Sequence, residues 1–140
     1  MKSSLDSSKY EMFFLFSEIA AALWVHIQCF EVTLRNFLSG SLSTIYNTRE
    51  WWLVPDLLSA EEISDVRKTI KSLEKHRIKI NPYSVMEHMG LTFWIKLLGK
   101  RYHQKIWMKI LKFFPVYPGR REDFYNKARE IRNLRNSIAH

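Results

Sequence analysis

The sequence predicts an all-α, single-domain helical bundle of about five helices. Its 140 residues suit one domain, and 46% of them are hydrophobic, enough for an ordinary core. Apolar residues recur at three- and four-residue steps through most of the chain, which is the period of an α-helix face. Four glycines and four prolines are too few for a turn-dense all-β design.

The first helix is expected within residues 10–46, which contain no proline and one glycine. Residues 1–9 are polar and Ser-rich and are expected to form a disordered tail, leaving 10–140 as the domain. The pattern leaves open whether 10–46 is one long helix or two joined near Ser17. The apolar positions that mark its face are Leu23, Ile27, Phe30, Leu34, Phe37 and Leu38.

Residues 47–55 break this period, and we expect Trp51 and Trp52 to cap the core from a loop. Ser59 and Glu62 then have the spacing of a capping box, which predicts a helix from there to about Arg77. The inward positions of that helix would be Ile63, Val66, Ile70 and Leu73.

Three more helical segments follow. Proline suits the first position of a helix, so Asn81 and Pro82 predict one that continues to Leu98, where Gly99 ends or relaxes it. Residues 101–114 predict a basic amphipathic helix, closed by two prolines. The last helix is expected over 121–140, with Phe124, Ala128, Ile131, Leu134 and Ile138 on its buried side.

The longest apolar run, residues 13–30, approaches the minimum length of a membrane-spanning helix. It contains Glu18, and an acidic or basic group at a membrane centre costs about 2.5–3.5 kcal/mol. Residues 1–9 are too polar for a signal peptide. We therefore expect a strongly buried helix with no membrane partner, and a membrane-associated helix is the less favoured alternative. Core positions are accordingly expected for His26, Trp24, Trp94 and Trp107.

The net charge of +8 is unevenly distributed. Residues 1–60 carry −2, whereas residues 61–140 hold 18 basic and 8 acidic side chains and carry +10. This asymmetry favours a polyanionic partner, nucleic acid first and an anionic membrane surface second. The single cysteine, Cys29, excludes an internal disulfide and any multi-cysteine zinc site. We expect a cytoplasmic protein that uses no metal and no cofactor.

The last helix contains the strongest candidates for chemistry. Arg132, Asn136 and His140 lie four residues apart on one stripe, and Arg135 borders it. An imidazole can deprotonate a ribose 2′-OH or protonate a leaving 5′-oxygen, and a guanidinium can hold the phosphate. The alternative is a solvated helix end, because an Arg followed five residues later by a His arises often by chance in a chain this rich in arginine.

Other basic residues are candidates for substrate binding. Arg35 could pair with Glu31 one helical turn away, or Arg35 and Asn36 could line a cleft opposite the last helix. Arg101 and Lys105 begin a basic face that could follow a phosphate backbone or simply be solvated. The full basic series is Lys96, Lys100, Arg101, Lys105, Lys109 and Lys112.

The chain resembles the Abi-like (abortive-infection) family of the HEPN superfamily from about residue 20 to residue 140. Residues 30–36 (FEVTLRN) resemble its E-x-x-L-R-N element, and Trp51-Trp52 its aromatic pair. Residues 91–98 (LTFWIKLL) resemble its central segment, followed by Tyr102, Ile106-Trp107 and Phe114-Pro115. Residues 131–140 (IRNLRNSIAH) resemble its I-R-x-L-R-N-x-x-x-H signature.

The resemblance implies a HEPN-type bundle that works as a homodimer, with the last helices of the two copies facing each other. It implies a metal-independent endoribonuclease that acts as a toxin or in abortive infection against phage. His140 would be the general acid or base, Arg135 would hold the phosphate, and Asn136 would position the substrate or His140. Attack by the 2′-OH would leave a 2′,3′-cyclic phosphate.

Three questions stay open at this point. The family pattern continues past the histidine, so we expect this chain to be a truncated form with weak activity. Whether an antitoxin restrains it is not decided by the sequence. The alternative to an enzyme is a non-catalytic HEPN-like module that binds RNA or a protein.

Overall fold

The protein is an all-α bundle built around one long helix, as a computed structural model that describes residues 4–139 shows. The α-helices are α1 (Ser4–Tyr46), α2 (Ala60–Lys75), α3 (Pro82–Glu87), α4 (Leu91–Lys96), α5 (Met108–Ile110) and α6 (Arg121–Ala139). Short 3₁₀ or π turns cover Trp51–Leu53, Lys100–Tyr102, His103–Trp107 and Leu111–Phe113. The predicted all-α class is confirmed.

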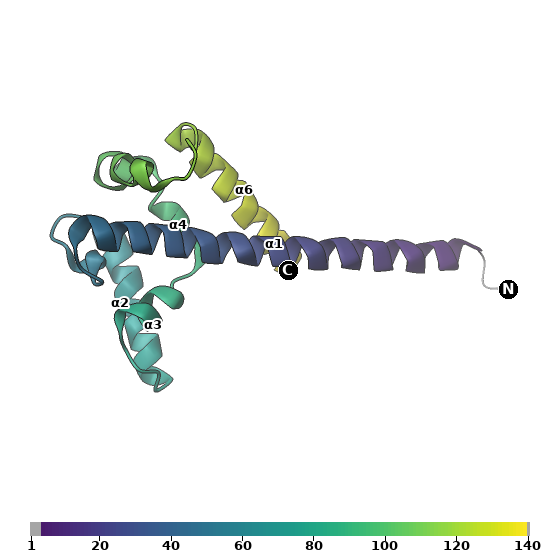
Figure 1. Cartoon of the computed structure of the whole chain (residues 1–140). Coiled ribbons are helices and arrows are strands. Elements are labelled where there is room, and N and C mark those ends of the chain that lie inside the picture. Colours follow the sequence, from purple (N-terminus) through teal and green to yellow (C-terminus); the bar gives the residue numbers. More distant parts are fainter. Residues whose placement is uncertain (1–3, 140) are drawn as a thin grey trace.

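The C-terminal half of α1 is the axis of the bundle (Figure 1). Helices α4 and α6 pack along one side of it, and α2 and α3 lie on the other side (Figure 1). Each of α3, α4, α5 and α6 contacts α1 directly. The N-terminal half of α1 projects beyond the other helices (Figure 1).

Helix α1 is a single helix, which decides between the two alternatives at Ser17. It begins at Ser4, so residues 4–9 are helical where a polar tail was expected. Its C-terminus is a Schellman motif, in which Asn47 adopts a left-handed conformation (φ 52°). The Thr48 N–H then donates to the Ser43 carbonyl at 3.2 Å. This motif turns the chain sharply and directs the next residues back along α1.

Ser59 is the N-cap of α2, as predicted, but the capping differs from the expected box. Its hydroxyl donates to the Glu62 carboxylate instead of accepting from the helix backbone. The hydroxyl of Tyr102 accepts from the Ser59 N–H at 3.0 Å and donates to the Ser59 Oγ at 3.2 Å. The start of α2 is therefore tied to the segment after α4.

The predicted helix from Asn81 to Leu98 is two helices. Asn81 caps α3, with its side chain accepting from the Ser84 N–H at 2.8 Å, and Pro82 is the first helical residue. The chain then breaks, and Gly90 becomes the N-cap of α4. Apolar periodicity alone could not show this break, because Met89 and Leu91 are both buried on either side of it.

Residues 100–113 form a continuous succession of helical turns of 3₁₀, π and α type. Its apolar side chains Tyr102, Ile106 and Ile110 are fully buried. Its basic side chains are exposed: Arg101, Lys105, Lys109 and Lys112. The amphipathic character predicted here is confirmed, although the helix is irregular.

The core lies where these helices meet the C-terminal half of α1. It contains Leu34, Leu38 and Leu42 of α1 together with Trp51, Trp52, Trp94 and Trp107. The burial predicted for Trp94 and Trp107 is confirmed, and Trp51 and Trp52 enter the core from a short 3₁₀ turn where a loop was expected. Burying such aromatic residues supplies much of the hydrophobic stabilisation of a domain this small.

An aromatic cluster and one arginine fix the start of α6. The ring of Phe114 lies 4.4 Å from that of Phe37 and 5.7 Å from that of Phe124, measured between centroids. Arg121 donates from Nη1 to the Leu98 carbonyl at 3.1 Å and from Nε to His103 Nδ1 at 3.2 Å. These contacts hold the first turns of α6 against α1 and the segment that precedes it.

The burial expected for residues 13–30 is wrong for most of that run. Phe13 and Phe16 are 66% and 63% exposed, and only Ile27 in this run is buried. His26 is exposed and Trp24 is half-buried, so neither belongs to the core as expected. The helix has the length and composition of a membrane span, and 6% of its most apolar window is buried. We call residues 10–25 the apolar arm.

Candidate functional site

The end of α6 presents two arginines and an asparagine from neighbouring turns. Arg132 and Arg135 are half-buried and Asn136 is exposed. Within residues 4–139 neither guanidinium forms an ion pair or a side-chain hydrogen bond. Their N–H donors are therefore available to an anion from solvent. His140 lies outside the described residues.

The apolar side of α6 is only partly covered over the same turns. Ala128 is buried, and Phe124, Ile131 and Ile138 are half-buried, as predicted for the inner side. Leu134, which was also expected to face inward, is 40% exposed. The last turns of α6 run beside the middle of α1, where the apolar arm ends (Figure 1).

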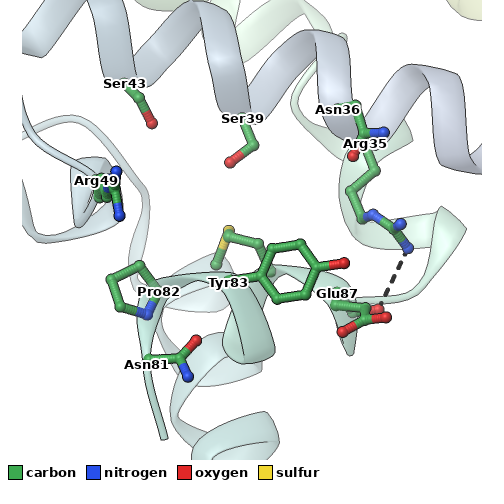
Figure 2. Close-up of a pocket in the computed structure, with 10 residues that line it drawn as sticks. Arg35, Asn36, Ser39, Ser43, Arg49, Asn81, Pro82, Tyr83 and Glu87 are labelled. Carbon is green, nitrogen blue, oxygen red and sulfur yellow. Dashed lines mark hydrogen bonds between the residues drawn. The ribbon is translucent and has the colours of Figure 1, made fainter.

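Arg35 and Asn36 do not line a cleft opposite α6, which was one of the two alternatives for them. They line a cleft of about 300 Å³ between α1 and α3, and every residue that lines this cleft comes from α1, the loop after α1, or α3 with its cap. Within the described residues Arg35 forms no ion pair with Glu31. One of its N–H groups donates instead to the Glu87 carbonyl at 3.4 Å (Figure 2).

This α1–α3 cleft gathers residues that the sequence analysis did not connect. Figure 2 shows Ser39 and Ser43 above the cleft on α1, and Tyr83 and Pro82 below it on α3. Arg49, from the loop after α1, lies at the opposite end from Arg35 (Figure 2). One signal was present, since Arg35, Ser39 and Ser43 recur every four residues and so share a helix face.

Arg101 and Lys105 lie away from the end of α6. The Lys105 ammonium donates to the Asp56 carbonyl in the loop before α2, and Arg101 borders a shallow hollow lined by Glu61, Glu62 and Lys96. The structure thus brings Arg132, Arg135 and Asn136 together on one helix end. It does not join Arg35, Asn36, Arg101 or Lys105 to them within one chain.

Part of the basic series has structural roles. Lys96 donates to Glu61 at 2.8 Å and to Asp65 at 3.3 Å, linking α4 to α2. The hydrogen bond and the positive charge of Lys96 hold the pKa of Glu61 below its usual value. Lys109 donates to the Tyr46 hydroxyl at 3.1 Å and lies over that ring. These ammonium groups are already occupied by groups of the protein itself.

Comparison of the chain with protein-family models, with curated proteins and with solved structures found no match in any of the three.

Proposed function

We propose that the protein is a metal-independent endoribonuclease of the HEPN type. The observation that supports this most is the end of α6, where Arg132, Arg135 and Asn136 are accessible and the two guanidinium groups have no partner in the described chain. A phosphodiester would place its charged oxygens between these donors. The resemblance of residues 131–140 to the family signature gives Arg135 and His140 their roles.

In this proposal the RNA itself supplies the nucleophile. His140 removes the proton of a ribose 2′-OH, or protonates the leaving 5′-oxygen, and Arg135 stabilises the charge that builds on the phosphate. Asn136 orients the phosphate or the imidazole. The products are a 2′,3′-cyclic phosphate and a 5′-OH, and no metal takes part. A toxin or anti-phage role in the cytoplasm follows from the same resemblance.

We propose further that the active form is a homodimer. In a pair of copies, two α6 helices that face each other would combine two sets of Arg135, Asn136 and His140 in one RNA-binding groove. The incompletely covered side of α6 at Leu134 supports this, since an exposed leucine beside an exposed apolar helix is a surface that a second copy can bury.

Cleavage of total RNA in the presence of EDTA tests the proposed reaction. The 140-residue chain should cleave RNA with protein in excess, and Arg135→Ala or His140→Ala should reduce the rate by at least 100-fold. Arg67→Ala, which removes an exposed arginine from α2, is the matched control and should leave the rate unchanged. The cyclic phosphate is detected at the 3′ end of the products.

Two outcomes would contradict the proposal. Cleavage that survives both substitutions would point to another site or to a contaminant. RNA that is bound but never cleaved would instead support the alternative, a non-catalytic module that binds RNA. Circular dichroism of each variant establishes that the helices are retained.

A further inference from the structure

The α1–α3 cleft has the composition of a nucleotide-binding site. It is open, has a volume of about 300 Å³ and is lined by ten residues, of which Glu87 is the one acidic member. Arg35 and Arg49 mark its two ends, and an exposed tyrosine lies between them (Figure 2). Met86, which is 95% buried, belongs to its lining as an apolar surface.

The hydrogen-bonding groups of this cleft are mostly donors. The Ser39 oxygen accepts from Trp51 Nε1 at 3.2 Å, which leaves the hydroxyl hydrogen to donate. The Asn81 side-chain oxygen accepts from the Ser84 N–H, which leaves its NH₂ group. Arg35 uses one of its five N–H groups on the Glu87 carbonyl. These donors and the two arginines favour a ligand that is rich in acceptors and negatively charged.

The aromatic residue in the cleft adds a second requirement. Tyr83 follows the proline that starts α3 and is 72% exposed, so its ring is not part of the core. Its ring lies across the cleft below Ser39 (Figure 2). Exposed aromatic rings beside arginines are the usual platform on which a nucleic acid base stacks.

We propose that the α1–α3 cleft binds one nucleotide unit, with its base stacked on Tyr83, one of its flanking phosphates held by Arg35 at one end of the cleft and the other by Arg49 at the opposite end. The basic charge of the chain favours a nucleotide within a single-stranded RNA over a free one. Ser39, Ser43 and Asn81 line the same cleft and offer hydroxyl and amide donors to the ribose and base edges. This site is separate from α6 and does not depend on any cleavage there.

Binding of an end-labelled eight-nucleotide single-stranded RNA, followed by fluorescence anisotropy, tests the proposal. Arg35→Ala and Arg49→Ala should each weaken binding by roughly tenfold or more, because each loses charge-assisted bonds to phosphate. Tyr83→Ala should weaken it by roughly fivefold to 100-fold through lost stacking. Tyr83→Phe keeps the ring and should bind as the unchanged chain does.

The controls remove the same groups outside the cleft. Arg67→Ala and Tyr117→Ala alter an exposed arginine and an exposed tyrosine and should leave the affinity unchanged. Arg135→Ala lowers cleavage in the proposed reaction, yet it should not abolish the effect of Tyr83→Ala on binding. A failure of the α6 proposal and a failure of this one are therefore distinguishable.

Adenosine monophosphate and inorganic phosphate, added as competitors of the labelled RNA, show whether the cleft recognises the base or only the phosphate. Competition by the mononucleotide at a lower concentration than phosphate supports recognition of the base as well as the phosphate. Equal competition by phosphate alone would overturn the proposal, because it would mean that Tyr83 contributes nothing. Unchanged RNA affinity in both the Arg35→Ala and Tyr83→Ala variants would overturn it as well.

Discussion

Lys96 shows how one side chain joins two helices of this bundle. Its ammonium group is shared by Glu61 and Asp65, which lie one turn apart on α2, while Lys96 itself ends α4. The hydrogen bond to Glu61 is the main cause that raises the pKa of Lys96, and the same bond lowers the pKa of Glu61. Each charged form stabilises the other.

The Lys96→Met substitution should return the pKa of Glu61 toward its usual value of 4.5. A lowered carboxyl pKa in the folded state contributes stability above the unfolded-state pKa, and that stability is lost as the pH falls through the folded-state value. The raised pKa of Lys96 contributes stability that is lost as the pH rises through its folded-state value. Titration of the Glu61 carboxyl by NMR measures the change.

Lys71→Met, an exposed change elsewhere on α2, is the control and should leave the Glu61 titration where it is. A Glu61 pKa that does not rise in Lys96→Met would show that the ion pair is not formed in solution. Because Glu61 is exposed, added salt should also weaken the effect.

At the scale of the element, the C-terminal end of α2 is set by local backbone geometry that amino-acid composition alone does not predict. Arg77, two residues after α2, adopts a left-handed conformation with φ 57°, and the Ile78 N–H donates to the Leu73 carbonyl at 2.9 Å. This is a Schellman motif, and glycine is the residue that adopts its left-handed position without steric cost. The sequence predicts that this helix ends at about Arg77, two residues after its observed end at Lys75.

Arg77→Gly should be more stable than Arg77→Ala by about 1 kcal/mol, because alanine retains the steric cost of the left-handed conformation. Both variants lose the same charge, so their difference isolates the backbone term. Urea unfolding followed by circular dichroism gives the free energies of unfolding. Equal stabilities would mean that residue 77 is not left-handed in solution.

At the scale of the whole molecule, the apolar arm is a large apolar surface that the rest of the chain does not cover. Five consecutive residues, 12–16, are large, apolar and exposed, and they surround the helix because each is rotated by about 100° from the last. One flat partner surface would cover only part of them. Two helices of a second copy, its α1 and its α6, would cover more.

Charge and area both favour a second copy as the occupant. Residues 1–25 carry Asp6, Glu11 and Glu18 against Lys2 and Lys9, a net charge of −1, so the basic half of a partner attracts this segment weakly and an anionic membrane does not. Four of its aromatic rings, those of Tyr10, Phe13, Phe14 and Phe16, are 62–66% exposed. Covering these four would bury roughly 400–600 Å², a large part of the roughly 800 Å² that each partner contributes to a standard interface.

Phe13→Glu combined with Phe16→Glu should weaken the dimer by at least tenfold, because each change places a charge in the apolar interface. Val116→Glu alters an equally exposed apolar residue outside the arm and should leave the dimer intact. Sedimentation equilibrium in detergent-free buffer measures the association. A monomer that floats with phosphatidylcholine vesicles would overturn the proposal in favour of membrane association.

The sequence determined the helical class, most helix starts and part of the buried residues of the second half, because these follow from short-range spacing and capping. Trp94 and Trp107 are buried as their apolar surroundings predicted, whereas Trp24, predicted on the same ground, is only half-buried. The capping residues Ser59 and Asn81 begin α2 and α3 as their side chains predicted. Arg132, Arg135 and Asn136 share one helix end, which the period of a helix is sufficient to place.

Only the tertiary structure decided which side of a helix meets another helix and which meets solvent. Periodicity shows that a helix has an apolar face, but it does not show which other segment packs against that face. Residues 13–30 were therefore predicted to lie in the core, although no helix of the chain covers most of them. For the same reason the sequence left open whether Arg35 and Asn36 line a cleft opposite α6, whereas the turn at Asn47 and the cap at Asn81 bring Arg49 and Tyr83 to them. Contacts between distant segments depend on how the whole chain packs, and that information lies in no single stretch of sequence.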